Sequence, residues 1–205
     1  MDTVAQTIAK FELYVDDNST MSSSETLDLY NKIYQRVLDA YMWTFLQKEY
    51  TGTHTAGVVT LPSDFKYFTF NEEEDGEKSI VIYVGSNFEP YKVIPFDRRR
   101  EYRNVKGYAY LDAFARELKF TVAPDDTAVE FDYIYRPTAL DTTDTPILPS
   151  NSSVIYHGMA MDFFMIDNTP KNRSYFEEHK KAYGEALDAL ILENFNLYGA
   201  NNGII

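Results

Sequence analysis

The stretch from Tyr133 to Phe195 carries the strongest signals for the fold and reads YIYRPTALDTTDTPILPSNSSVIYHGMAMDFFMIDNTPKNRSYFEEHKKAYGEALDALILENF. It begins with an alternating apolar pattern that is typical of a strand, and Pro137 ends this strand. A loop bracketed by prolines follows, and Pro170 then begins the second of two helices, because proline suits the first helical position. The stretch contains no catalytic motif, so we interpret it as a scaffold that packs two helices against another surface.

Apolar residues at helical spacing predict two further helices before the strands. The first covers residues 3–14. The second follows Ser22 and Glu25, which form a capping box in which each side chain binds a free backbone amide at the helix start. Its apolar stripe continues to Phe45, so we expect this helix to end near Lys48. After the strands, the pattern predicts helices over residues 153–166 and 171–195.

Between the two pairs of helices, alternating segments rich in aromatic and β-branched residues predict five to seven strands. The clearest are residues 65–70, 79–84, 108–111, 117–121 and 128–135. The predicted fold class is therefore α+β: a helical bundle built from the N-terminal and C-terminal helices, with an antiparallel β-sandwich or a curled sheet as an insertion. We expect three parts: a helical body of residues 1–50 and 137–196, a β insertion of residues 51–136, and an extended C-terminal tail of residues 197–205.

The composition bears on several classes of function. The chain has 205 residues, of which 32 are acidic and 19 basic, and a formal net charge of -13. A dedicated nucleic-acid-binding protein would show a basic face, although an acidic wall is compatible with DNA that passes without being held. The absence of cysteine excludes disulfides, thiolate metal sites and cysteine nucleophiles. The sequence has neither an apolar run of the ~18 residues that span a membrane nor a secretory signal, so we expect synthesis in a cytosol.

Aromatic residues are abundant, with 17 tyrosines and 14 phenylalanines. A tyrosine can bury its ring and still reach a polar partner, which suits subunit interfaces. Tyrosine is also common in strands for reasons of packing alone. The sequence leaves both interpretations open.

Few side chains in the sequence indicate a catalytic, metal-binding or phosphate-binding site. His54, His157 and His179 show no metal-ligand spacing, so we interpret each as structural. The acidic run Glu72–Asp75 lacks the spaced ligands of a calcium loop and is better explained as a solvated hairpin tip, which also discourages aggregation between strands. The sequence has no Gly-x-Ser-x-Gly nucleophile motif and no phosphate-binding glycine loop. We therefore expect no enzyme activity, no cofactor and no metal.

The basic cluster of the sequence is DRRREYR, residues 97–103. Arginine suits the binding of phosphate, but this cluster is short and is interleaved with Asp97 and Glu101. Ion pairs to an acidic neighbouring subunit explain it better than contacts with nucleic acid. An alternative function, a soluble ligand-binding module or an enzyme with an unrecognised site, would place that site near Arg98–Arg103.

Several short segments follow one another in a characteristic order. They are WTF at residues 43–45, LPSDF at 61–65, YIYRP at 133–137 and DTPILP at 144–149, then a helix with Tyr156, Ala160 and Phe164, and a final helix with Tyr175, Phe176 and YGEAL at 183–187. Over residues 3–195 this layout resembles the head-to-tail connector adaptors of tailed bacteriophages, including the podovirus tubular or tail-accessory proteins that dock beneath the portal. The acidic run at Glu72 and the residues after Leu197 have no counterpart in that layout.

The resemblance implies a structural protein of the virion neck, made in the host cytoplasm, that forms a ring around a channel crossed by DNA. Such rings commonly have twelve copies. It also implies contacts with the portal protein on one side and with tail or nozzle proteins on the other, without enzyme activity, a membrane or specific DNA binding. We predict that the residues of these contacts include Arg98, Arg99, Arg100, Arg103, Tyr156, Phe164, Tyr175, Phe176, Tyr198, Ile204 and Ile205.

Overall fold

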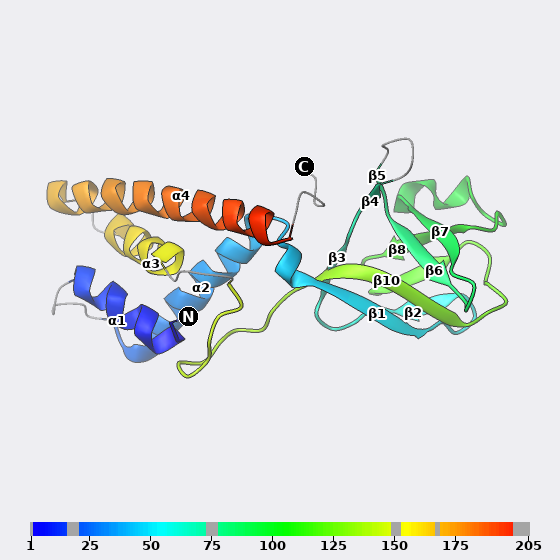
Figure 1. The fold of residues 1–205 in the computed structure, drawn as a ribbon, viewed down its shortest axis with the longest axis horizontal. Coiled ribbons are helices and arrows are strands. Elements are labelled where there is room, and N and C mark those ends of the chain that lie inside the picture. The colour runs from blue at the N-terminus through cyan, green and yellow to red at the C-terminus, as the bar shows by residue number, and fades with distance from the viewer. Residues whose placement is uncertain (1, 16–20, 73–77, 149–152, 167–168, 199–205) are drawn as a thin grey trace. The chain divides into compact units, whose positions relative to one another are not determined.

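The computed structural model describes residues 2–15, 21–72, 78–148, 153–166 and 169–198. The chain divides into two units, one made of Met1–Phe45 with Thr138–Ile205 and the other of Leu46–Pro137 (Figure 1). The first unit is helical and the second contains the main sheet. The α+β class, with helices contributed by both ends of the chain, is therefore confirmed.

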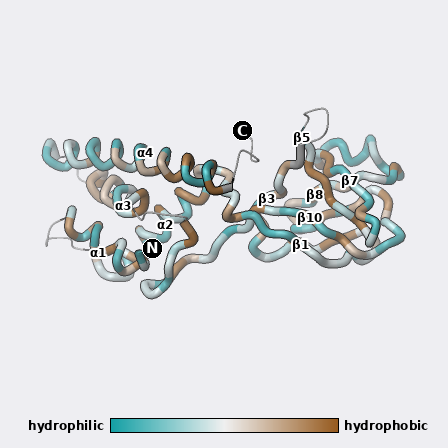
Figure 2. Tube along the Cα trace, viewed as in Figure 1, coloured by the Kyte–Doolittle hydropathy of each residue, from teal (hydrophilic) through white to brown (hydrophobic). Residues whose placement is uncertain are grey.

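Among the described residues, four α-helices build the helical unit: α1 (Val4–Val15), α2 (Ser23–Asp39), α3 (Ser153–Ile166) and α4 (Pro170–Tyr198). Helix α3 packs against each of the other three. Figure 2 shows α3 largely in hydrophobic colours, whereas the first half of α4 is largely hydrophilic. A helix that is apolar on most sides is suited to a central, buried place, and α3 accordingly buries Val154, Ile155, Met159 and Ala160.

The two ends of α2 show how single contacts set a helix boundary. At its start, Ser22 Oγ accepts a hydrogen bond from the Glu25 backbone N–H at 3.3 Å, and the Glu25 carboxylate accepts one from the Ser22 N–H at 2.7 Å. This confirms the predicted capping box. At its end, the indole N–H of the fully buried Trp43 donates to the Val37 carbonyl at 2.9 Å. The prediction that this helix continues to about Lys48 is wrong, because this contact closes the last turn and the chain then changes direction.

Asn31 on α2 holds the proline-bracketed loop that returns the chain to α3. Its side-chain amide donates to the Leu140 carbonyl at 3.0 Å, and its Oδ1 accepts from the Leu140 N–H at 2.8 Å. The start of α1 also contributes, since the Val4 N–H donates to the Asp144 carbonyl at 2.9 Å. The predicted extended loop is thus fixed to α1 and α2 through its backbone.

In the part of the chain that the structure describes, the strands of the second unit fall into two sheets. The larger is β1 (Gln47–Thr53), β2 (Val58–Thr60), β3 (Phe65–Phe68), β6 (Val81–Val84), β7 (Glu89–Ile94), β8 (Tyr108–Asp112), β9 (Glu117–Phe120) and β10 (Ala128–Tyr135), and the smaller is β4 (Asn71–Glu72) with β5 (Lys78–Ser79). The order in the larger sheet is β1-β10-β6-β7-β8-β9-β2, and β3 also pairs with β10. A bridge between Thr55 and Val58 brings the end of β1 beside the start of β2, so the sheet curls back until it is nearly closed. Of the two predicted arrangements, the curled sheet is the one present.

The strand pair β7 and β8 is parallel and departs from the predicted antiparallel arrangement. Parallel neighbours need a crossover of roughly a dozen residues. Residues 95–107 form this connection, which includes the 3-10 helix η2 (Phe96–Arg100), and we name it the arginine crossover. Alternation along a strand carries no information on strand direction, so the sequence pattern did not reveal this pair.

Strand β1 forms where the local pattern favours a helix end and a loop. Its sequence, QKEYTGT, is mostly exposed and shows no apolar alternation. The strand pairs with β10 along its whole length, from Gln47 opposite Ile134 to Thr53 opposite Ala128. Pairing with a strong neighbouring strand therefore determines this element, as is common for strands of weak intrinsic preference.

Large aromatic side chains fill the inside of the curled sheet. The ring of Phe131 on β10 lies 4.6 Å from the ring of Tyr50 and 5.2 Å from that of Phe68. Tyr91 is fully buried and meets Phe120 edge-on at 5.1 Å between ring centroids. Part of the abundance of tyrosine and phenylalanine is thus explained by the core of this unit.

Candidate functional site

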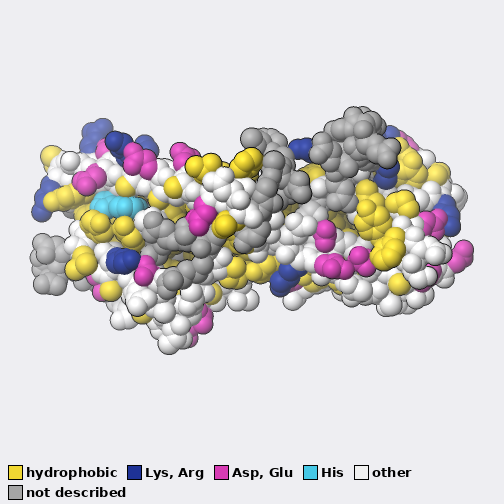
Figure 3. Space-filling model, in the orientation of Figure 1, with side chains coloured by type: hydrophobic (Ala, Val, Ile, Leu, Met, Phe, Trp, Pro, Cys, Tyr) yellow, Lys and Arg dark blue, Asp and Glu magenta, His cyan; other side chains and the backbone are white. Residues whose placement is uncertain are grey.

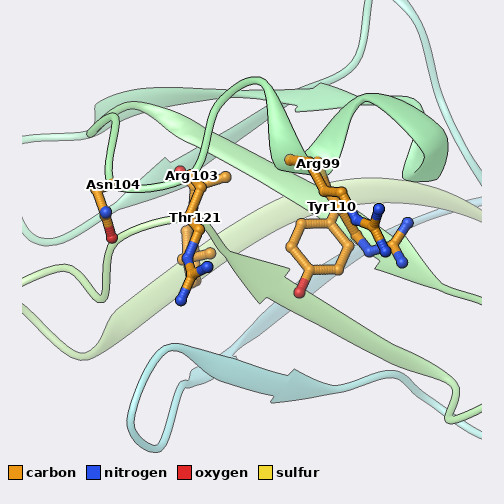
Figure 4. Close-up of a pocket in the computed structure, with 7 residues that line it drawn as sticks. Arg99, Arg103, Asn104, Tyr110 and Thr121 are labelled. Atoms are coloured by element: carbon orange, nitrogen blue, oxygen red, sulfur yellow. The ribbon is translucent and has the colours of Figure 1, made fainter.

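The arginine crossover places three of the predicted interface arginines around one pocket. This pocket has a volume of about 320 Å³ and is lined by Arg99, Arg100, Arg103, Asn104, Tyr110, Phe120 and Thr121. In Figure 4, Arg103, Asn104 and Thr121 lie toward one end of the pocket, and Arg99 and Tyr110 lie toward the other. The strands β8 and β9 supply the floor, and the crossover supplies the charged rim.

Two arginines of the crossover are engaged by their own neighbours. Arg98 lies outside the pocket lining, where its guanidinium pairs with Glu101 at 3.0 Å and donates to the Tyr102 hydroxyl at 3.1 Å. The hydrogen bond from Arg98 to Glu101 raises the pKa of this guanidinium. Arg99 donates to the Phe96 carbonyl at 2.7 Å and lies 3.8 Å above the Phe96 ring. These contacts hold the crossover in shape.

Arg100 and Arg103 differ from these two. Both are exposed, and within the described residues neither side chain makes a hydrogen bond or an ion pair. Exposed arginines commonly find a carboxylate in an acidic protein, because guanidinium and carboxylate form paired charge-assisted hydrogen bonds. Two unpaired arginines on the rim of one pocket, in a chain of net charge -13, therefore mark this pocket as a candidate site for an anionic group.

The helical unit brings three of the predicted aromatic residues into one cluster. The ring of Tyr156 on α3 stacks on that of Tyr14 on α1, with 5.7 Å between their centroids. On the same helix Phe164 lies 5.1 Å from Tyr175 and 5.8 Å from the imidazole of His179, both on α4. Phe164 is only 6% exposed, so it packs inside the unit, whereas Tyr175 reaches the surface with 37% exposure.

A histidine pair lies at the centre of this cluster and was not expected from the sequence. Nδ1 of His157 on α3 lies 2.9 Å from Nδ1 of His179 on α4. Burial lowers the pKa of both imidazoles, and for His157 the neighbouring His179 lowers it further. The separation of the two nitrogen atoms fits a hydrogen bond in which one imidazole donates to the other. Figure 3 shows histidine on the surface of the helical unit among hydrophobic side chains. The two residues belong to different helices, so no spacing within one helix could have indicated the pair.

Asp162 provides a second polar contact that the sequence did not single out. It lies on the otherwise apolar α3 and is 7% exposed. Arg36 binds its carboxylate with two hydrogen bonds of 2.8 Å, and Lys32 adds one of 2.9 Å. Burial alone would raise the pKa of Asp162, but the hydrogen bonds from Arg36 and Lys32 lower it. The carboxylate therefore stays ionised and joins α3 to α2.

The remaining predicted residues belong to α4 or follow it in the sequence. Phe176 on α4 is half-buried, with the Lys180 ammonium 5.6 Å from its ring centroid. Tyr198 is the last residue of α4. Ile204 and Ile205 lie outside the described residues. The structure thus gathers the arginines in one unit and the aromatic residues in the other.

The described side chains contain no group of three or more histidine, aspartate or glutamate residues placed to hold a metal ion. Across the described helices, none is both long and apolar enough to cross a membrane.

Comparison with known proteins gives one clear relationship. No curated protein matches the chain. Residues 2–202 match the family of SU10 adaptor proteins, which covers nearly the whole sequence and both structural units. Membership of this family implies a structural role and no enzyme activity. The resemblance seen in the sequence is therefore confirmed: the chain belongs to the SU10 adaptor protein family, the phage head–tail adaptors.

Proposed function

We propose that this adaptor forms a ring, of twelve copies, between the portal protein and the tail of the virion, where it surrounds the channel that DNA crosses. The observation that carries the proposal is the family match over residues 2–202, because it includes both units rather than one shared domain. In this role the portal protein lies on one side of the ring and tail or nozzle proteins lie on the other.

The charge of the chain supports a channel that does not retain DNA. The net charge of -13 gives a surface that repels phosphate at long range, and such repulsion lets a duplex pass without specific binding. The positive side chains of the arginine crossover are few and lie beside Asp97 and Glu101. We therefore assign DNA the role of a passing molecule and not of a ligand.

The last turns of α4 carry an apolar surface that supports protein contacts. Leu192, Phe195 and Leu197 are exposed by 60%, 49% and 59%. Leu192 and Phe195 are three residues apart and so lie on the same side of the helix. Exposed apolar side chains that gather on one element commonly mark a surface for another protein. We propose that this end of α4 contacts a neighbouring copy or the portal.

The test is assembly with the portal protein of the same phage. The chain is mixed with purified portal rings and examined by native mass spectrometry and electron cryomicroscopy. We expect a ring of adaptor copies bound to each portal. The double variant Leu192→Ser/Phe195→Ser should weaken this assembly, whereas Asn196→Ser, a polar and exposed neighbour on the same helix, should leave it unchanged. A chain that remains monomeric and never binds the portal would overturn the proposal.

The alternative of a separate ligand-binding module has one observation in its favour, the pocket at the arginine crossover. Its three arginines favour an anion, but its open rim and exposed guanidiniums suit a polymer segment better than an enclosed small molecule. We therefore regard the pocket as a contact site within the assembly.

A further inference from the structure

We propose that the arginine pocket binds an acidic segment of a second copy of this chain, residues 72–77 with the sequence EEEDGE. The pocket is the one lined by Arg99, Arg100 and Arg103. The segment holds five carboxylates in six residues, the densest negative charge in the sequence. This contact between copies rests on the proposed ring, since it needs neighbours that present both surfaces.

The first support is the state of the arginines. Arg98 and Arg99 are held by Glu101 and Phe96, whereas Arg100 and Arg103 have no side-chain partner among the described residues. Free guanidiniums on the rim can each bind a carboxylate through two parallel hydrogen bonds. The pocket therefore offers positions for at least two carboxylates of an incoming chain.

The second support is the shape and polarity of the floor. Tyr110 is half-buried, and Phe120 is buried beneath the charged rim. Thr121 uses its hydroxyl to donate within its own unit, toward the carbonyls of Val105 and Tyr108 at 2.6 and 2.9 Å. The floor thus contributes the ring of Tyr110 beside the charged rim, and the methylene groups of a glutamate side chain can lie on this ring while its carboxylate reaches the arginines.

The third support is the identity of the anion. A nucleic acid would offer phosphates to the same guanidiniums, but a free duplex has to approach the chain from solution against the repulsion of its net charge of -13. A short acidic peptide segment on a neighbouring copy is held close by the assembly, so its effective concentration is high even if each ion pair is weak. An acidic segment of a second copy is therefore favoured over DNA.

The test uses the full chain and a fluorescently labelled peptide of residues 70–79, FNEEEDGEKS, with binding followed by fluorescence anisotropy at low and at physiological salt. We expect binding to the unchanged chain that weakens as salt rises, because screening reduces contacts between exposed charges. The variant Arg100→Gln/Arg103→Gln should reduce the affinity at least tenfold. The control Arg98→Gln removes one positive charge from the same crossover but outside the pocket, and it should change the affinity less than threefold.

Charge reversal gives a second check in the same assay. The variant Arg100→Glu/Arg103→Glu should lose the acidic peptide and should bind a peptide with lysine in place of its five acidic residues. Restored binding would support a direct contact between these charges. If the reversed pair of partners does not bind, the contact is not formed by these arginines.

Four outcomes would overturn the inference. The peptide does not bind the unchanged chain. Arg98→Gln weakens binding as much as the pocket variant, so that only overall charge matters. A DNA duplex displaces the peptide at lower concentration than unlabelled peptide does, so that nucleic acid is the favoured occupant. A chain whose own five acidic residues are changed to Gln or Asn gains more than tenfold in peptide affinity, so that each pocket is filled by its own chain.

This assay is separate from the assembly test. The peptide binds or fails to bind a single chain whether or not rings form on the portal. If rings form on the portal but the peptide does not bind, only the proposed contact is refuted. If the peptide binds but no rings form, only the proposed ring assembly is refuted.

Discussion

At Gly158, α3 packs tightly against both α2 and α4, and a substitution there tests this packing. A Cβ atom at this position would lie 2.5 Å from Ile33 Cγ2 on α2 and 3.1 Å from two ring carbons of Tyr183 on α4. Ordinary carbon–carbon contacts are about 3.5–4.0 Å, so the Ile33 methyl group would have to move by about 1 Å. Ile33 is fully buried, and its branched side chain has little rotational freedom in a helix, so this movement strains the core.

We predict that Gly158→Ala destabilises the helical unit by about 1 kcal/mol. Overpacking of a core typically costs about 1–3 kcal/mol, and the better helix propensity of alanine offsets about 1 kcal/mol of this. Gly184 on α4 is the matched control, because a Cβ there meets nothing within 4 Å. Gly184→Ala should therefore stabilise the unit by about 1 kcal/mol through propensity alone. The two substitutions are chemically identical and should act in opposite directions.

Urea unfolding followed by tryptophan fluorescence measures both variants. Trp43 is the single tryptophan, is fully buried and belongs to the helical unit, so its emission reports the unfolding of that unit. With a slope of about 2 kcal/mol per molar urea, the midpoints of the two variants should differ by about 1 M. The double variant Ile33→Ala/Gly158→Ala should be no less stable than Ile33→Ala, because the obstructing methyl group is gone.

If Gly158→Ala raises the midpoint as Gly184→Ala does, then α2, α3 and α4 do not meet as closely as described. If Gly158→Ala still destabilises the chain in the Ile33→Ala background, the strain arises elsewhere.

Two further predictions concern polar groups of the helical unit. Asp162→Asn should lower the unfolding free energy by about 2 kcal/mol, less than the loss of a fully buried ion pair, because Arg36 and Lys32 remain partly exposed; equal urea midpoints at pH 7 would contradict this. The pKa values of His157 and His179 are lowered in the folded chain. The unfolded chain therefore binds more protons near and below about pH 6.5, the usual pKa of histidine. The free energy of unfolding should accordingly fall as the pH drops from about 7.5 toward 5.5. The pH-matched urea midpoints should fall less for His179→Gln, and an equal fall would assign the effect to other groups.

The helices show how far local sequence determines this fold. Residues 153–166 were predicted as a helix with the bounds that the structure gives to α3, because an uninterrupted apolar pattern, an entry loop with proline and polar residues at its end all agree. The start of α2 was equally clear from Ser22 and Glu25. Its end was not, because the stop depends on the indole of Trp43 folding back to Val37, a contact that periodicity does not describe.

The sheet and the candidate site were less accessible for a related reason. Strand β1 exists through its pairing with β10, and the direction of β8 beside β7 follows from the path of a crossover. The arginine cluster was visible in the sequence, but the separation of Arg98 from Arg100 and Arg103 depends on how that crossover turns. The pair of His157 and His179 joins two helices, so only the packed structure reveals it.

The pairing of β1 with β10 also indicates where the sheet unit could be removed or replaced by protein engineering. The strands that enter and leave the sheet unit are direct partners, with Gln47 opposite Ile134, so their backbones lie about 5 Å apart at the junction. The sheet unit is therefore an insertion whose two ends lie side by side. A turn of a few residues could close the gap, and a different β cassette could be grafted at the same point without lengthening the path of the chain.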